Sequence, residues 1–373
     1  MEQSTPNIKP SARLAFVCEC DPEARSACEG EPVYHELDGK QYCVLHYPAD
    51  KDNAVFQAAV DRKLSNREYN FRGVWFPAEI RFSKAEFGTN VDFVDAVFNG
   101  TVGFRKANFA KPAYFNRATF NGEVNFSQVR FREGVNFSDA TFHRQVSFYY
   151  AHFNAEVDFT GTAFGDLANF YGATFGDHVR FAGGERLARI NSLDLQFARI
   201  EKPDRLYFHS LTARPSWFVN VDVRRFDFIN VNWDWRTIEE EVASLRARDI
   251  TAEHRMLAIA YRRLAYNAEE NHRYEEASTF RYRATESARL QRDNPDQCDK
   301  RIEIRALSWF YWLVSGYGER VWQALVVLLG ILVLFGLIKS KLTGQPLFRG
   351  TMRVAIVGAL AAAAAFGIAK LII

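Results

Sequence analysis

Phenylalanine recurs between Phe71 and Phe181 at steps that alternate between five and six residues. Two positions before most of these phenylalanines stands a smaller apolar residue, which is alanine before the five-step ones and mostly valine before the six-step ones. The repeating unit is therefore eleven residues long, Ala-x-Phe-x-x-x-Val-x-Phe-x-x. These steps follow neither the 3.6-residue period of a helix nor the two-residue period of a strand. They fit a chain that turns a corner every five or six residues.

Four sides of this kind make a coil of about 22 residues, which is two repeat units. Each side would point one large and one small apolar residue inward, so that equivalent residues of successive coils form columns. One such column contains Phe87, Phe109, Phe131, Phe153 and Phe175. Adjacent coils would pair at roughly the 4.8 Å spacing of neighbouring strands. Because burying one phenylalanine contributes about 2–3 kcal/mol, we expect these columns to dominate the stability.

The repeat resembles the pentapeptide-repeat family, whose Ala-x-Phe-x-x motif is matched by Ala-Thr-Phe-Asn-Gly at 118–122 and Ala-Thr-Phe at 140–142. The resemblance implies a mainly β fold, a right-handed quadrilateral β-helix over residues 71–235. The additional residue in alternate steps is similar to an eleven-residue variant of the family. The left-handed six-residue β-helix of certain acyltransferases is the rival, but that fold needs three sides of six residues.

Residues 51–70 are predicted to form a capping helix. The pattern from Asp52 to Asn66 is amphipathic, with Val55, Phe56, Val60 and Leu64 on one side. The end of a β-helix exposes unpaired backbone groups and apolar side chains, and a terminal cap covers them.

The N-terminal cysteines are candidate metal ligands. All five cysteines lie outside the phenylalanine repeat, and the polar N-terminus contains no secretory signal, which favours thiols or metal ligands over disulfides. Cys43 and His46 are close enough to bind one metal ion. Cys28 can add a third ligand, and Cys18 or Cys20 a fourth, which gives a tetrahedral site that suits zinc. Four protein ligands leave no open position for a substrate, so the zinc would be structural. The alternative is unligated thiols near a chance histidine.

The stretch Tyr-Cys-Val-Leu-His at 42–46 resembles short zinc-binding modules that end in Tyr-Cys-x-x-His. The resemblance covers about thirty residues and implies a small module within residues 1–50. Similar modules place their first cysteine ten residues before the second, which implies Cys18 as the ligand, with Cys20 as the alternative.

Residues 236–300 are predicted to be helical. The composition shifts there to alanine, glutamate and arginine, and two helical patterns, 253–270 and 274–290, flank a turn near Asn271. Their apolar spacing resembles a single tetratricopeptide-like hairpin. Asn294 and Pro295 end the helical pattern.

The C-terminal residues 301–373 are predicted to form an interfacial helix and two transmembrane helices. An aromatic cluster at 309–312 suits the membrane interface. Val321 to Ile338 is uncharged and apolar for eighteen residues, the lower limit for a span. A second apolar run, Val354 to Ala369, contains small residues that suit close contact between helices. The alternative, two buried core helices, lacks other helices to bury them.

Basic residues flank the first apolar run almost equally, so the positive-inside rule leaves the orientation open. The absence of a signal and the thiol-rich N-terminus favour two cytoplasmic termini. The stretch Tyr-Gly-Glu-Arg at 317–320 resembles the lead-in to the ion-channel-like helices of some membrane-attached pentapeptide-repeat proteins. No filter sequence follows between the two runs, which puts conventional channel function in doubt.

No catalytic set and no site for an organic cofactor emerges from the sequence, so a non-enzymatic function is expected. The first hypothesis is a membrane-anchored scaffold, whose partners are the lipid bilayer and a protein or further copies of the chain. The second is an oligomeric membrane effector or pore gated by its cytoplasmic part. The third is a gyrase-inhibiting mimic of DNA, but the net charge of +2 and the arginines interleaved among the acids argue against it and against a nucleic-acid partner.

Overall fold

The computed structural model describes residues 17–183, 190–251, 253–293, 309–313 and 321–344, together with Met352 and Ile356. The chain divides into two compact units, Met1–Trp235 and Arg236–Ile373, and each is considered by itself. The first unit contains the phenylalanine repeat and the N-terminal cysteines. The second contains the helices that follow the solenoid in sequence.

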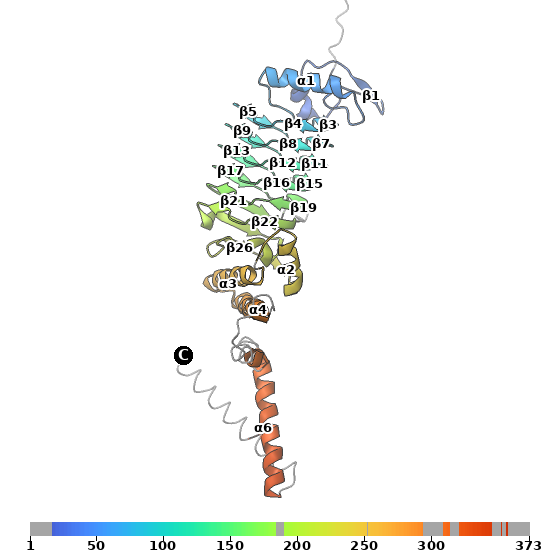
Figure 1. Cartoon of the computed structure of the whole chain (residues 1–373). Helices are drawn as coiled ribbons and strands as arrows, with labels where there is room; N and C mark the ends of the chain where they lie inside the picture. The colour runs from blue at the N-terminus through green and yellow to red at the C-terminus, as the bar shows by residue number, and fades with distance from the viewer. Residues whose placement is uncertain are drawn as a thin grey trace, which may run out of the picture. The chain divides into compact units, whose positions relative to one another are not determined.

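The repeat forms a four-sided β-solenoid of short parallel strands, stacked coil upon coil (Figure 1). The first face contains β6 (Val91–Asp92), β10 (Ala113–Tyr114), β14 (Val135–Asn136), β18 (Val157–Asp158), β21 (Val179–Ala182), β24 (Leu206–His209) and β26 (Asp227–Ile229). The second face contains β5 (Glu86–Phe87), β9 (Asn108–Phe109), β13 (Arg130–Phe131), β17 (His152–Phe153), β20 (Thr174–Phe175) and β23 (Arg199–Ile200).

The other two faces meet in one sheet. The third face contains β3 (Trp75–Phe76), β7 (Val97–Phe98), β11 (Thr119–Phe120) and β15 (Thr141–Phe142), and the fourth contains β4 (Ile80–Arg81), β8 (Val102–Gly103), β12 (Val124–Asn125) and β16 (Val146–Ser147). The longer strand β19 (Ala163–Asn169) pairs with both β15 and β16, and β22 (Ile190–Asp194) pairs with β19 on its other side. One strand therefore spans both faces at this coil, and its pairing with β22 shifts register between Phe164 and Leu167.

The register confirms the predicted coil of 22 residues. Phe109 pairs with Phe131 and Phe131 with Phe153, each step being one coil. The ring centroids of these two pairs lie 4.8 and 5.4 Å apart, and the rings are nearly parallel. The rings of the repeat are buried, so the interior is filled with side chains up to its axis.

Two kinds of corner explain the alternating steps. In each five-residue step a β-turn closes with a hydrogen bond, as from the amide of Ala107 to the carbonyl of Phe104. The third residue of this turn has a positive φ, which is 61° at Lys106 and 51° at Tyr150. The equivalent residues recur every eleven positions: Lys84, Asp95, Lys106, Arg117, Gln128, Asp139, Tyr150, Gly161 and Gly172. The six-residue steps have no left-handed residue and use one residue more.

One row of these corners is important for the surface of the solenoid. We call it the corner column, and it consists of Lys84, Lys106, Gln128, Tyr150, Gly172 and Phe197. The amide of each member donates to the carbonyl before the next member, as from Lys106 to Ser127 and from Gln128 to Tyr149. The column therefore lies along the solenoid, one residue per coil.

Gly122 lies in the corner of a six-residue step, which we call a wide corner. This position tolerates no side chain. A Cβ atom at Gly122 would meet the backbone of Gly100, one coil earlier. We expect Gly122→Ala to destabilise the chain by about 1–3 kcal/mol, because stacked backbone must move apart. Chemical denaturation followed by circular dichroism measures this loss. Gly88→Ala, where a Cβ would have nothing within 4 Å, is the matched control. Equal stability of the two variants would contradict the close stacking of the wide corners.

The helix α1 (Asn53–Ser65) covers the first coil (Figure 1). Asp52 caps it by accepting hydrogen bonds from two amides of the first turn. The ring of Phe56 contacts that of Phe76 edge to face, with 5.5 Å between centroids. Val55, predicted on the buried side, is 46% exposed, because the buried stripe follows Phe56, Ala59, Val60 and Lys63 instead. The helix thus covers the apolar end of the solenoid, as expected.

The N-terminal module consists of a 3-10 helix and a hairpin. The 3-10 helix η1 (Pro22–Cys28) starts at a proline, with the side chain of Asp21 accepting from the amide of Glu23. Strands β1 (His35–Leu37) and β2 (Lys40–Tyr42) are joined by Asp38 and Gly39, both with positive φ. Asp-Gly is a strong hairpin signal that the sequence analysis did not use.

Beyond Phe181 the coils become irregular, as the fading period predicted. Pro203 and Pro215 each begin a short 3-10 helix, η2 (Pro203–Arg205) and η3 (Pro215–Phe218). The last described strand pair is β25 (Thr212–Ala213) with β27 (Asn232–Trp233).

The second unit begins with α2 (Ile238–Arg246), a helix that the sequence analysis did not separate, although Thr237 and Glu240 form a capping box. Helices α3 (Glu253–Glu270) and α4 (Tyr274–Asp293) pack together as the predicted hairpin, and His272 adopts a positive φ between them. Residues 309–313 are helical, and α6 (Val321–Thr343) follows. The second predicted span, apart from Ile356, lies outside the described residues.

Candidate metal centre

Three segments of the N-terminal module bring four ligand groups together. Cys18 precedes η1, Cys28 ends it, and Cys43 and His46 lie in the loop after β2. The three sulfur atoms and one ring nitrogen of His46 lie within 4.8 Å of one another, and all four residues are buried. Three thiols and one imidazole are the donors of a common structural zinc site.

The orientation of His46 suits metal binding through Nδ1. Its Nε2 lies 2.9 Å from the carbonyl oxygen of Arg72, so Nε2–H donates to that oxygen. Nδ1 is left facing the Sγ atom of Cys43 at 3.4 Å. A tetrahedral zinc ion would hold a sulfur and a nitrogen about 3.6 Å apart. A carbonyl that fixes the tautomer of a histidine in this way is a typical outer partner of a metal ligand.

Hydrogen bonds within the cluster shift its protonation. Interactions with Cys20, Cys28 and Cys43 hold the pKa of the Cys18 thiol well below its usual range, and the backbone amide of Cys43 donates to the same sulfur at 3.3 Å. Burial alone would lower the pKa of His46, but hydrogen bonds to Cys18, Cys20 and Cys43 outweigh it and raise that pKa to about 12. A proton and a metal ion compete for Nδ1, so metal binding here would release protons.

The positions of the sulfur atoms bear on the choice between Cys18 and Cys20 as the fourth ligand. The group of mutually close ligand atoms contains Cys18 and not Cys20. Cys20 is buried beside the cluster, and its thiol lies 4.0 Å from the carbonyl oxygen of Cys18. Successive residues of an extended segment point to opposite faces, and residues two apart point to the same face. Spacing alone therefore could not separate Cys18 from Cys20.

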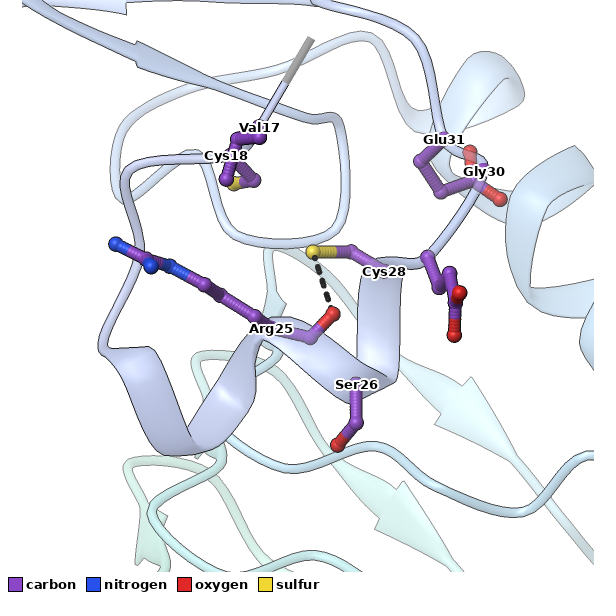
Figure 2. Close-up of a pocket in the computed structure, with 8 residues that line it drawn as sticks. Val17, Cys18, Arg25, Ser26, Cys28, Gly30 and Glu31 are labelled. Atoms are coloured by element: carbon purple, nitrogen blue, oxygen red, sulfur yellow. Dashed lines mark hydrogen bonds between the residues drawn. The ribbon is translucent and has the colours of Figure 1, made fainter. Parts of the chain in front are cut away.

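A solvent-open pocket reaches the cluster. Figure 2 shows its wall, which includes Cys18, Arg25, Ser26 and Cys28, with the Cys28 thiol hydrogen-bonded to the carbonyl oxygen of Arg25 at 3.4 Å. Two of the four candidate ligands therefore border this pocket.

Residues outside the cluster hold the module against α1 and the first coil. Lys51 donates to the carbonyls of Val44 and Leu45, between the two ligands of that loop, and burial lowers its pKa to about 7. The buried ammonium of Lys63 donates to the carbonyl of Ala27, beside Cys28. Neither contact could be predicted from the sequence, because both join a side chain to a backbone carbonyl.

Charged contacts add to this attachment. The guanidinium of Arg72 pairs with Glu23 of η1 and with Asp92 of the next coil. Arg62 of α1 pairs with Glu31, whose side chain is 8% exposed. The carbonyl of Arg72 also accepts the hydrogen bond from Nε2–H of His46, so Arg72 links the metal cluster to the first coil.

Comparison with known proteins identifies the repeat. The family model described as Pentapeptide repeats (9 copies) matches residues 104–152, which lie in the regular part of the solenoid. The chain therefore contains pentapeptide repeats in its β-solenoid, as the phenylalanine pattern predicted. Neither the curated proteins nor the solved structures contain a match to it.

A second family model, described as the VIT family, matches residues 308–370. This segment includes α6, and within the described part of the chain α6 is the one helix long and apolar enough to cross a membrane, over Leu325–Thr343. Almost none of this stretch is buried by other described residues. The match and the exposed apolar helix together indicate a membrane protein.

Proposed function

We propose that the chain is a non-enzymatic, membrane-anchored scaffold whose β-solenoid presents rigid faces to a protein partner in the cytoplasm. The observation that carries this proposal is that one chain combines a solenoid with a filled interior and an exposed apolar helix. Because stacked rings occupy the inward positions of the repeat, a partner would be recognised by the outward side chains. The segment matched by the VIT family supplies the anchor.

The metal that we assign to the N-terminal cluster is structural zinc, held by Cys18, Cys28, Cys43 and His46. Its donor set, burial and fixed histidine tautomer support zinc. It would supply folding free energy to a module of few residues and thereby complete the cover over the first coil.

The outward charges favour a protein partner over nucleic acid. Ion pairs join neighbouring coils, as between Arg117 and Asp95 or between Lys111 and Glu133. Such pairs neutralise much of the surface, whereas a mimic of DNA needs one continuous acidic face and a DNA-binding protein a continuous basic one.

A second candidate is an oligomeric effector or pore formed by the C-terminal segment. The VIT-family match over 308–370 favours it, because the match lies in the membrane part rather than in the solenoid. The small residues of 354–369 support contact between helices, and this run lies outside the described residues apart from Ile356.

Membrane extraction tests the anchor. We expect the full-length chain to stay with membranes through an alkaline carbonate wash, because α6 is long enough to span the hydrocarbon layer. A fragment of residues 1–294 should be soluble. Full-length chain that washes off would contradict the scaffold and the pore together.

Liposome conductance then separates the two candidates. A pore predicts ion conductance and an oligomer in detergent that Gly358→Leu disrupts without loss of insertion. The scaffold predicts no conductance and partner binding that survives Gly358→Leu.

A further inference from the structure

The corner column changes character along the solenoid. Its first members are the exposed cations Lys84 and Lys106, and its later members are the exposed rings of Tyr150 and Phe197. Each of these residues has a positive φ at the equivalent corner of its coil. Hydrogen bonds from amide to carbonyl connect these corners through successive coils. Basic and aromatic groups therefore follow each other along one edge of a rigid body.

The basic part extends onto the second face. Arg130 on β13 and Arg132 just after it line a shallow depression together with Lys106, Asn108, Tyr150 and His152. Its wall contains one carboxylate, that of Glu86, which accepts a hydrogen bond from Asn108. Arg132 bonds to the neutral Asn108, and among the described residues Lys106 and Arg130 have no carboxylate within ion-pair distance.

Other parts of the solenoid contrast with this depression. Lys111, Arg117 and Arg180 each pair with a carboxylate of a neighbouring coil. Cations held close together without counter-charges repel one another, and an anionic ligand would relieve that repulsion. The depression therefore has the electrostatics of a site for carboxylates.

The aromatic part is a ladder of exposed rings. Tyr149 stacks on Tyr171 with 5.5 Å between centroids, and Tyr171 contacts Phe197 at 5.2 Å. Tyr149, Tyr150 and Phe197 are 41%, 43% and 57% exposed. Exposed tyrosines of this kind give large contact area at low entropic cost, and they are enriched at protein interfaces.

The basic depression and the aromatic ladder together form one strip along the solenoid. We propose that this strip is the docking site of the scaffold and that its occupant is an extended protein segment with an acidic half followed by an apolar half. The acidic half lies against Lys106, Arg130 and Arg132, and the apolar half against Tyr149, Tyr171 and Phe197. From Lys84 to Phe197 the column spans five coil steps, about 24 Å, which is the length of about seven extended residues. The inference rests on the scaffold function proposed above.

The test uses full-length protein in detergent and a fluorescent probe peptide of four glutamates followed by Ala-Leu-Ala-Phe. The control peptide has the same composition with the glutamates alternated along it. We expect the block peptide to bind more tightly than the alternated one, and the binding to weaken with added salt. The double variant Arg130→Glu/Arg132→Glu should raise Kd at least about tenfold, because attraction becomes repulsion.

Two further variants check each half of the strip. The double variant Tyr149→Ser/Phe197→Ser should also weaken the block peptide severalfold, while leaving its salt dependence unchanged. Arg144→Glu reverses an exposed cation at the corner between the third and fourth faces and should leave Kd unchanged. Thermal unfolding of each variant establishes that the solenoid is intact.

Several outcomes would overturn the inference. They are no binding of the block peptide by the wild type, equal binding of the two peptides, or equal Kd values in the wild type and both strip variants. Tighter binding of a twelve-nucleotide thymidine oligonucleotide that is lost in the charge variant would assign the strip to nucleic acid instead. If the protein stays with membranes in the carbonate wash but does not bind the peptide, the docking site is contradicted and the scaffold function is not. If the protein washes off the membranes, the scaffold function itself is contradicted.

Discussion

Replacing Cys43 with serine is expected to abolish zinc binding and to unfold the N-terminal module. Cys43 is fully buried, faces Nδ1 of His46 and donates its amide to Cys18, so its loss removes a ligand at the centre of the cluster. Binding of structural zinc supplies about 10–16 kcal/mol in small modules, and such modules lose their fold without it. Elemental analysis of the purified chain measures the metal, and hydrogen exchange over residues 17–50 measures the unfolding.

The chain offers matched controls for this experiment. His46→Ala should lose the metal as Cys43→Ser does, since it removes the nitrogen ligand. Cys20→Ser, which changes a buried thiol beside the cluster, should keep one zinc per chain. A wild type purified without metal would mean that the four residues are ordinary buried thiols and a histidine, and zinc loss in Cys20→Ser would mean that the ligand set is wrong.

Phe131→Ala is expected to destabilise the solenoid by about 3–5 kcal/mol, because it leaves a cavity that the neighbouring coils cannot fill. The ring of Phe131 is 1% exposed and is stacked between those of Phe109 and Phe153. It also meets Phe126 and Phe137 of its own coil at 6.2 Å. Collapse around the cavity is hindered because every neighbour is held by its own strand pairing.

Arg130→Ala is the control for that experiment, one position away in the same strand. Arg130 is exposed, and its replacement should change the free energy of unfolding by less than about 0.5 kcal/mol. Chemical denaturation of both variants in the same detergent gives the comparison. Similar losses at the two positions would be incompatible with an inward Phe131 and an outward Arg130.

The regular part of the fold could be predicted from sequence because each coil repeats the same burial. Val135 pairs with Ala113 and Val157, as the 22-residue period requires. The corners could not be predicted in the same way, since Lys106 and Gln128 adopt a left-handed conformation that favours glycine or asparagine. Their neighbours in the stack impose that conformation, and nothing local in the sequence indicates it.

The metal cluster was predictable only in part. The spacing of Cys43 and His46 indicated that they could share a metal ion, whereas Cys18 and Cys20 are only two positions apart and the pattern did not choose between them. The contact from His46 to the carbonyl of Arg72 involves a backbone atom 26 positions away, which no side-chain pattern records. For the same reason the attachment of Lys51 and Lys63 to backbone carbonyls was missed.

Strand β19 has a mechanical consequence. Most coils are joined to their neighbours by two-residue strands on each face, so a pulling force along the stack is shared among a few hydrogen bonds per coil. At β19 seven residues form one strand, which pairs through two residues each with β15 and β16 on one side and through four residues with β22 on the other. Under tension, coils separate one after another at the weakest junctions. The junction between β19 and β22 should then be among the last to open, so a load applied at the N-terminal end would separate the coils before this junction first.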